Sequence, residues 1–303
     1  MEKTVDSVIR ARPLLGTFVE ITARGAEVRQ LERAVDAAFA GIERVHGLMS
    51  YHEPHSDVSR LNRAHRGAPV VIHEWTASVL KASIDLQNRS KGLFNIAVGT
   101  ALERLGLLPS SHDPSAHAGA VGDQCAVELL PRSSARLLVP GNTIDLGGIA
   151  KGFAVDQAVA VLRASGVVGG VVNAGGDLFV FGPDEHVVAI RDPRNPTRLM
   201  AHTKLREAAL ASTALSFDPV IPERPSYCSI IDPRSGEPAA IMSGATVRAP
   251  SCMIADALTK VIMIGGKDAS EVLEHYRASG LFMTKNGDVL ATADWEDVLT
   301  LAA

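Results

Sequence analysis

The sequence predicts an α+β fold with a mixed, largely antiparallel core. Apolar residues make up 46% of the 303 residues and charged residues 21%, which is typical of a globular chain with a substantial core. Some apolar residues recur every three or four positions, as on a helix, and others alternate or run together, as in strands. The two kinds of segment follow each other without a regular βαβ rhythm, so we expect an α+β rather than an α/β arrangement.

The first elements follow from these local patterns. Residues 14–23 alternate enough for an opening strand, and residues 27–48 place their apolar positions on one face of a long helix. A polar loop over 50–60 precedes a second helix over 76–88, which we expect to end at Gly92.

The stretch 109–122 is rich in Ser, Pro, Gly and Ala, and we interpret it as a loop and a candidate insertion. After it, strands are expected at 135–139, 143–146, 167–172, 178–181 and 187–191, and helices at 152–164, 255–264 and 269–278. Three prolines make 219–225 irregular, and Asn286-Gly287 is typical of a hairpin turn.

Charge and hydropathy exclude several classes of protein. A net charge of -4 argues against a nucleic-acid or membrane-surface partner, which would favour a basic face. No stretch approaches the ~20 apolar residues that a membrane-spanning helix needs, so no membrane insertion is expected. Residues 1–12 are charged rather than apolar, unlike a secretory signal, and we expect a cytoplasmic protein. Three cysteines are too few for a disulfide scaffold.

The segment 144–152, I-D-L-G-G-I-A-K-G, has the composition of an anion site. Two glycines let a ligand approach the backbone, Lys151 carries a positive charge, and a helix follows whose amino end favours anions. Asp145 could accept hydrogen bonds from a heterocycle or a ribose. The alternative is a glycine turn with a surface salt bridge, and the pattern does not decide between them.

A second segment places Asp256, Thr259 and Lys260 on one face of a helix. A carboxylate and a hydroxyl on one face suit a hard cation such as Mg²⁺. A plain Asp256–Lys260 ion pair is the alternative that this spacing favours. Cys252, just before these residues, is expected to be a small buried apolar residue rather than a nucleophile.

Two glycine-containing turns are expected to be structural. The turn 173–177, N-A-G-G-D, lacks the G-x-G-x-x-G spacing and leads into a strand, so we expect Asp177 to bond backbone there. Asp232 is expected to cap the D-P-x-x-G turn that ends a strand near Ile231. The ten histidines show no metal-ligand spacing.

Seven short segments, in order along nearly the whole chain, together resemble the ApbE family, the FAD:protein FMN transferases. They are L-G-T at 15–17, one segment at 49–62 that holds both M-S-Y-H and S-D-V-S-R-L-N, G-L-F-N-I at 92–96, 145–152, 173–177, 231–236 and A-D-A-L at 255–258.

The resemblance implies a single bilobed domain over residues 1–303 with an FAD site between the lobes and Mg²⁺ at the pyrophosphate. It implies transfer of FMN from FAD to a Ser or Thr hydroxyl of an acceptor flavoprotein, with release of AMP. The implied FAD contacts are Leu15, His52, Leu93, Phe94, Asn95, Asp145, Lys151 and Ile231. The implied metal ligands are the Gly148 carbonyl, Asp256 and Thr259.

This chain departs from the family pattern around the implied metal and base. Lys260 stands where the family usually has Thr, Ser229 where it often has a His proposed as base, and His52 where it has an aromatic flavin neighbour. We therefore expect Asp256, Lys260 and Ser229 to form the catalytic set, with Lys260 replacing Mg²⁺ at least in part. Asp256 or a water would then be the base, and Asp256→Ala is expected to abolish turnover while leaving the fold intact.

Two alternative functions stay open on the sequence. One is an FAD-binding relative whose altered site makes it an FAD hydrolase or a flavin carrier. The other is a catalytically silent interaction protein that keeps only the fold. Retention of FAD on purification would separate the second alternative from the enzyme and the carrier.

Overall fold

The computed structural model describes residues 6–65, 67–109, 125–138, 141, 143–215, 229–239, 241–295 and 299–301. Most of the expected insertion loop at 109–122 and the proline-rich stretch 219–225 therefore lie outside the described residues. Among the described helices, none is long and apolar enough to cross a membrane. The cytoplasmic location stays a prediction.

The fold is built on a large antiparallel sheet with the strand order β1-β2-β6-β7-β10-β13-β14-β15. Its strands are β1 (Asp6–Leu14), β2 (Thr17–Gly25), β6 (Gly169–Ala174), β7 (Asp177–Phe181), β10 (Ala208–Ala214), β13 (Met242–Ala249), β14 (Ser279–Thr284) and β15 (Val289–Ala291). Every neighbouring pair in this sheet is antiparallel. The α+β class with largely antiparallel sheets is thus confirmed.

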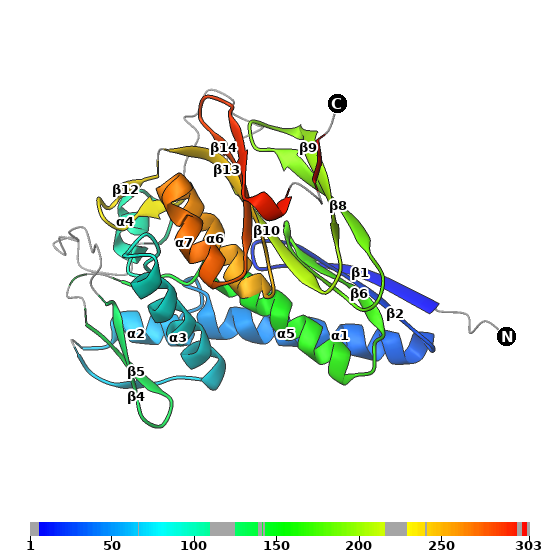
Figure 1. Cartoon of the computed structure of the whole chain (residues 1–303). Coiled ribbons are helices and arrows are strands. Elements are labelled where there is room, and N and C mark those ends of the chain that lie inside the picture. Colours follow the sequence, from blue (N-terminus) through cyan, green and yellow to red (C-terminus); the bar gives the residue numbers. More distant parts are fainter. Residues whose placement is uncertain are drawn as a thin grey trace.

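Smaller sheets flank the large one, and their described pairs are antiparallel as well. They are β3 (Val70–Val71) with β5 (Ser134–Leu137) and β4 (Val127–Leu130), β8 (His186–Asp192) with β9 (Asn195–Leu205) and β16 (Leu299–Leu301), and β11 (Ile231–Asp232) with β12 (Glu237–Pro238). In Figure 1 the β3-β5-β4 sheet lies at one end of the molecule, beside α2 and α3, and the β8-β9-β16 sheet lies at the other.

Three long helices pack together beneath and beside the large sheet (Figure 1): α1 (Val28–Met49), α5 (Ala150–Ala164) and α6 (Cys252–Gly265). The other helices are α3 (Glu74–Arg89), which is similar in length to α5 and α6, and the short helices α2 (Asp57–Arg63), α4 (Gly99–Arg104) and α7 (Ser270–His275), with 3-10 turns at Gly266–Ala269 and Ala293–Trp295. The expected long helix at 27–48 is confirmed within one residue at each end, because its apolar positions, Leu31 to Met49, are the buried ones.

Helices α5 and α6 cross at a glycine. A Cβ at Gly152 would lie 2.2 Å from the carbonyl oxygen of Cys252, so only glycine lets the two backbones approach this closely. Asp156, one turn further along α5, accepts the backbone N–H groups of Cys252 (2.8 Å) and Met253 (2.9 Å). The amino end of α6 is therefore anchored to α5 by both packing and hydrogen bonds.

Two expected elements were wrong. The single strand at 14–23 is instead a hairpin, in which Leu14 pairs with Thr17 around a two-residue turn. The expected strand at 143–146 is not part of any sheet in the described structure, and its Ile144 is bonded to the side chain of Asn62. Apolar alternation alone predicts strand-to-strand hydrogen bonds in both places. A tight turn interrupts the first segment, and the Asn62 side chain takes the backbone hydrogen bonds of the second.

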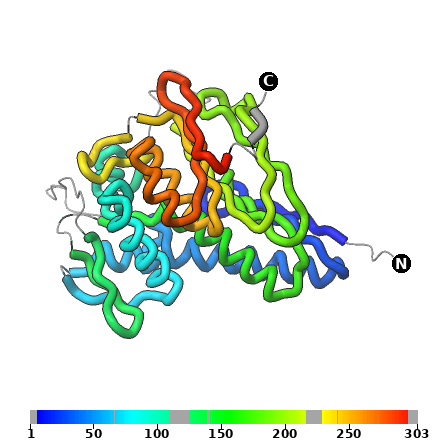
Figure 2. Tube along the Cα trace, viewed as in Figure 1, coloured from blue at the N-terminus to red at the C-terminus, as the bar shows by residue number. Residues whose placement is uncertain are grey.

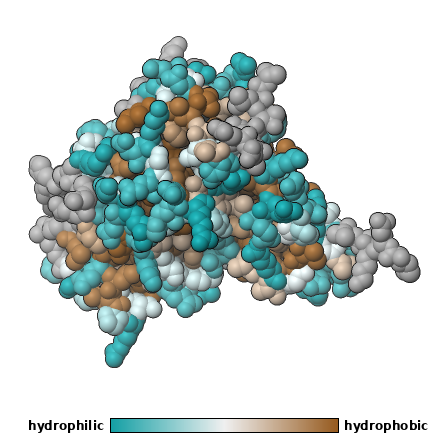
Figure 3. Space-filling model, in the orientation of Figure 1, coloured by the Kyte–Doolittle hydropathy of each residue, from teal (hydrophilic) through white to brown (hydrophobic). Residues whose placement is uncertain are grey.

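Hydrophilic residues cover most of the molecular face in Figure 3, and hydrophobic residues show there in separate patches, one of them near the β4 and β5 hairpin. The core itself is a large cluster between the sheet and the long helices. A smaller cluster around Trp295 and Leu281 lies between the large sheet and the β8-β9-β16 sheet. Cys252 is fully buried, as expected for that residue, and its not being a nucleophile stays a prediction.

Candidate functional site

Segments that are far apart in the sequence meet around one cavity of about 630 Å³. The end of α1, the segment 93–98, the amino end of α5, α6 and residues 229–233 all contribute lining residues. Figure 2 shows these blue, cyan, green and yellow-to-orange parts of the chain converging on one end of the molecule. The lining includes all eight residues that the family resemblance assigned to FAD: Leu15, His52, Leu93, Phe94, Asn95, Asp145, Lys151 and Ile231.

One wall of the cavity is the turn between β1 and β2. Leu15 has φ 56° and Gly16 has φ 71°, the left-handed pair typical of a two-residue hairpin turn. A leucine rarely adopts this conformation, and such strain often marks a functional position. The turn presents Leu15 to the cavity, which is where the sequence placed it.

The segment that carries Asp145 is fixed by hydrogen bonds from two other parts of the chain. The Asn62 amide donates to the Ile144 carbonyl and accepts its N–H, both at 2.9 Å, and the Asp145 N–H donates to the Ile96 carbonyl at 2.8 Å. The Asp145 carboxylate accepts the Gly147 N–H at 3.0 Å, so it folds back over its own turn. Burial raises the pKa of Asp145, although His52 and Lys260 oppose the shift. The result is a carboxylate held at a fixed place in the cavity wall.

The first turn of α5 carries Lys151, which lines the cavity and forms an ion pair with Asp177. Burial alone would lower the pKa of Lys151, but the carboxylates of Asp256 and Asp177 outweigh it, so the ammonium stays charged. The expectation that Asp177 bonds backbone in its turn was wrong, because the side-chain amide oxygen of Asn173 accepts the Gly176 N–H there instead (2.9 Å). Lys151 thus lies beside the cavity and forms a salt bridge, and anion binding by 144–152 stays a prediction.

On α6, Lys260 forms an ion pair with Asp256 at the cavity wall. The ammonium also donates to the Asp256 backbone carbonyl at 3.0 Å, and the other Asp256 carboxylate oxygen accepts the Gly152 N–H at 3.0 Å. Burial works against the ionised form of Asp256, but Lys151 and Lys260 outweigh it and lower its pKa. Asp256 is therefore a buried anion with partners on both oxygens.

These contacts do not fit the predicted magnesium site. Asp256 and Thr259 are both fully buried, and the Thr259 hydroxyl donates to the Asp256 carbonyl (2.7 Å) and bonds the Thr213 hydroxyl (2.8 Å). Gly148 lies against the Lys260 side chain, with Cε 3.5 Å from where a Cβ would be. A hard cation needs free oxygen ligands, and the expected carboxylate ligand, Asp256, is already paired with the ammonium of Lys260.

The same contacts revise the role of Asp256. A carboxylate that is 0% exposed and bonded on both oxygens has no path to the proton of an acceptor hydroxyl, so it does not fit a general base. Asp256→Ala would leave Lys260 without its carboxylate and remove the acceptor of the Gly152 N–H. We therefore expect that substitution to destabilise the fold, contrary to the expectation from sequence.

Ser229 lines the cavity, as the sequence predicted for a catalytic position, and so does Lys260. Sequence reasoning missed four further polar lining residues: His46, Ser50, Tyr51 and Thr213. The M-S-Y-H segment already contained Tyr51 and could have pointed to it. In the structure its hydroxyl donates to Glu103 and links this loop to α4. Nothing local marked His46, which lies in the last turn of α1 and pairs with Glu53 at 3.5 Å.

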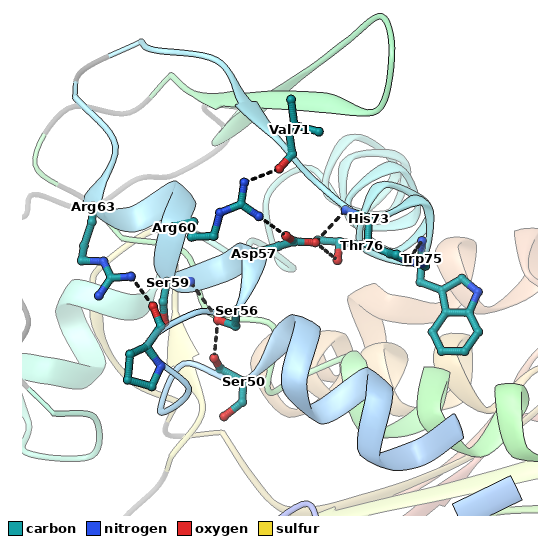
Figure 4. Close-up of polar contacts among 11 residues, drawn as sticks. Ser50, Ser56, Asp57, Ser59, Arg60, Arg63, Val71, His73, Trp75 and Thr76 are labelled. Atoms are coloured by element: carbon teal, nitrogen blue, oxygen red, sulfur yellow. Dashed lines mark hydrogen bonds and ion pairs between the residues drawn. The ribbon is translucent and has the colours of Figure 1, made fainter. Parts of the chain in front are cut away.

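The loop that carries His52 is held by the polar contacts shown in Figure 4. The Ser56 hydroxyl donates to the Ser50 carbonyl (2.7 Å) and accepts the Ser59 N–H (3.0 Å). Asp57 is buried and accepts the Thr76 hydroxyl (2.7 Å) and the His73 N–H (2.8 Å). The S-D-V-S-R-L-N stretch therefore supports the site rather than contacting a ligand.

A model of the ApbE family matches residues 15–282. The chain belongs to this family. It is 25% identical over 316 residues to a Vibrio cholerae protein named FAD:protein FMN transferase, covering 95% of this chain and 90% of that protein. A Rhodobacter capsulatus protein of the same name is 27% identical over 267 residues, covering 84% of this chain and 51% of the relative's length.

The fold of this ApbE-family chain is also that of solved ApbE structures. The crystal structure of the ApbE protein from Thermotoga maritima superimposes with a TM-score of 0.83 at 25% identity, covering 96% of this chain and 98% of that one. A Pseudomonas stutzeri flavinyl transferase ApbE in its apo form gives a TM-score of 0.80 at 19% identity, which shows a shared fold. The resemblance drawn from short segments is confirmed at the level of the family.

Proposed function

We propose that this chain is an FAD:protein FMN transferase that binds FAD in the cavity and passes FMN to a Ser or Thr hydroxyl of an acceptor flavoprotein. The observation that carries the proposal is that one cavity gathers all eight expected FAD contacts, Lys151 among them, together with a second lysine, Lys260. Membership of the ApbE family, whose curated relatives bear this activity in their names, supports it.

The chemistry is a phosphoryl transfer. The acceptor hydroxyl oxygen attacks the FMN phosphorus, the bond from that phosphorus to the oxygen of the AMP phosphate breaks, and AMP leaves with the bonding electrons. The hydroxyl proton passes to water. Such a reaction depends on positioning and on neutralising negative charge rather than on a covalent intermediate.

The residues of this chain supply both requirements in the proposal. Lys151 and Lys260 hold positive charge at the cavity wall, and the amino end of α5 adds its dipole. Leu15, Leu93 and Phe94 offer apolar surface for the flat rings of FAD. No step is assigned to magnesium, because Asp256 is already paired with Lys260.

The test is to incubate the chain with FAD and a flavin-free acceptor domain that carries a target threonine. We expect the acceptor to gain the mass of one FMN, in step with release of AMP measured by chromatography. An acceptor with its target threonine replaced by valine is the control and should gain no mass.

The other outcomes contradict the proposal in different ways. Release of FMN and AMP without a modified acceptor would show an FAD hydrolase, and FAD retained without turnover would show a carrier. A chain that binds no FAD at all would be an interaction protein that keeps only the fold.

A further inference from the structure

We propose that the Lys260 ammonium serves as a built-in cation at the pyrophosphate, so that this chain binds and cleaves FAD without a divalent metal. The inference rests on the proposed function, since it places FAD in the cavity described above. It concerns one side chain, whose contacts distinguish it from an ordinary surface lysine.

The position of Lys260 is the first part of the argument. Its ammonium contacts the Asp256 carboxylate and, at 3.0 Å, the Asp256 carbonyl oxygen. Oxygens of these two kinds are what a hard cation binds. The side chain is 15% exposed and lines the cavity, while its ammonium pairs with the buried carboxylate of Asp256.

Competition for Asp256 is the second part. One carboxylate oxygen bonds Lys260 and the other accepts the Gly152 N–H, so a metal bound there would compete with both of these donors. The aliphatic part of Lys260 lies against Gly148, whose carbonyl was the second expected ligand. The third, Thr259, already bonds Thr213 and the Asp256 carbonyl.

The balance of charge is the third part. Lys151 pairs with Asp177 and Lys260 pairs with Asp256, so two ammonium groups face two buried carboxylates. A divalent cation added to this set would leave an excess of positive charge in a buried place, which is costly. Removing the Lys260 charge would instead leave a buried negative charge that a divalent cation could balance.

The direct test measures metal binding to the wild-type chain with Mn²⁺ alone, by electron paramagnetic resonance of the free ion. We expect no stoichiometric binding by the wild type and a gain of one Mn²⁺ site in Lys260→Thr, which removes the charge and offers an oxygen. Lys267→Thr is the matched control, because Lys267 is exposed on the 3-10 turn after α6 and should change nothing.

A second measurement titrates FAD by the quenching of flavin fluorescence, in EDTA and in Mg²⁺. The wild-type affinity should agree within about twofold between the two conditions, a difference well below 1 kcal/mol. In EDTA the affinity of Lys260→Thr should fall by about tenfold or more, as expected for the loss of a hydrogen bond to a charged group, and Mg²⁺ should restore part of it.

Stoichiometric Mn²⁺ binding by the wild type, or loss of its FAD binding in EDTA, would overturn the inference even if FMN transfer is observed. If the wild type transfers no FMN, the proposed function fails, and the Mn²⁺ comparison between wild type and Lys260→Thr still tests this inference. If Lys260→Thr does not fold, the Mn²⁺ binding and the FAD titration of the wild type still test the inference.

Discussion

Replacing Gly152 by alanine tests whether the close crossing of α5 and α6 builds the site. Gly152 follows Lys151 on α5, and its N–H donates to Asp256 on α6 at 3.0 Å. A change at this position therefore disturbs the placement of both lysines relative to each other, although Gly152 itself offers no chemistry to a ligand.

The structure sets the size of the effect. An alanine Cβ would lie 2.2 Å from the Cys252 carbonyl oxygen, 2.5 Å from its carbonyl carbon and 2.8 Å from the Met253 Cα. All three atoms are backbone and cannot rotate away, so the overpacking cost should reach the upper part of the usual range, about 3 kcal/mol. A strained bond to Asp256 adds to this cost, whereas the better helix propensity of alanine offsets about 1 kcal/mol.

The assay is equilibrium unfolding in urea followed by circular dichroism, together with an FAD titration. We expect Gly152→Ala to lower the free energy of unfolding by about 3 kcal/mol and to weaken FAD binding. Gly47→Ala is the matched control, because Gly47 lies inside α1 with no atom within 4 Å of an added Cβ. It should raise the stability by about 0.5–1 kcal/mol. A Gly152→Ala protein as stable as Gly47→Ala would refute the reasoning.

Two further substitutions test other contacts. Asn62→Ala should cost about 2–4 kcal/mol in the free energy of unfolding and weaken FAD binding, because it strands the buried N–H and carbonyl of Ile144, while exposed Asn88→Ala should change neither. Tyr276→Phe should cost about 1 kcal/mol at neutral pH, because Tyr276 donates to the half-exposed carboxylate of Asp85 at 2.6 Å. Burial would raise the pKa of Asp85, but its bonds from Arg89 and Tyr276 lower it below its ordinary value, so this contribution is present above the unfolded-state pKa and is lost as pH falls through the folded-state pKa. A Tyr276→Phe cost that is unchanged in urea titrations at acid pH would contradict the Asp85 assignment.

The sequence was sufficient for the parts of the fold that depend on local pattern. The amphipathic spacing of 27–48 predicted α1, and Asn286-Gly287 predicted the turn between β14 and β15, where Gly287 has φ 96°. The hairpin at Leu15 was missed because its turn contains no residue with an intrinsic preference for positive φ at the first position.

In the candidate site, too, local features could be predicted from the sequence and long-range pairings could not. Short segments were enough to name the eight expected FAD contacts, all of which line the cavity, because each segment is recognised by itself. The pairing of Lys151 with Asp177 and of Gly152 with Asp256 joins residues 26 and 104 positions apart, and only the crossing of α5 with α6 and β7 brings them together. The spacing of Asp256 and Lys260 did predict their ion pair, since both lie on one helix.

A crystal structure of the chain with FAD, grown in EDTA, tests the central claim most directly. The account predicts FAD in the cavity, with pyrophosphate oxygens in contact with the ammonium groups of Lys151 and Lys260 and with Lys260 still paired to Asp256. FAD bound elsewhere would contradict the proposed site. Pyrophosphate that contacts neither lysine would contradict the role given to both of them.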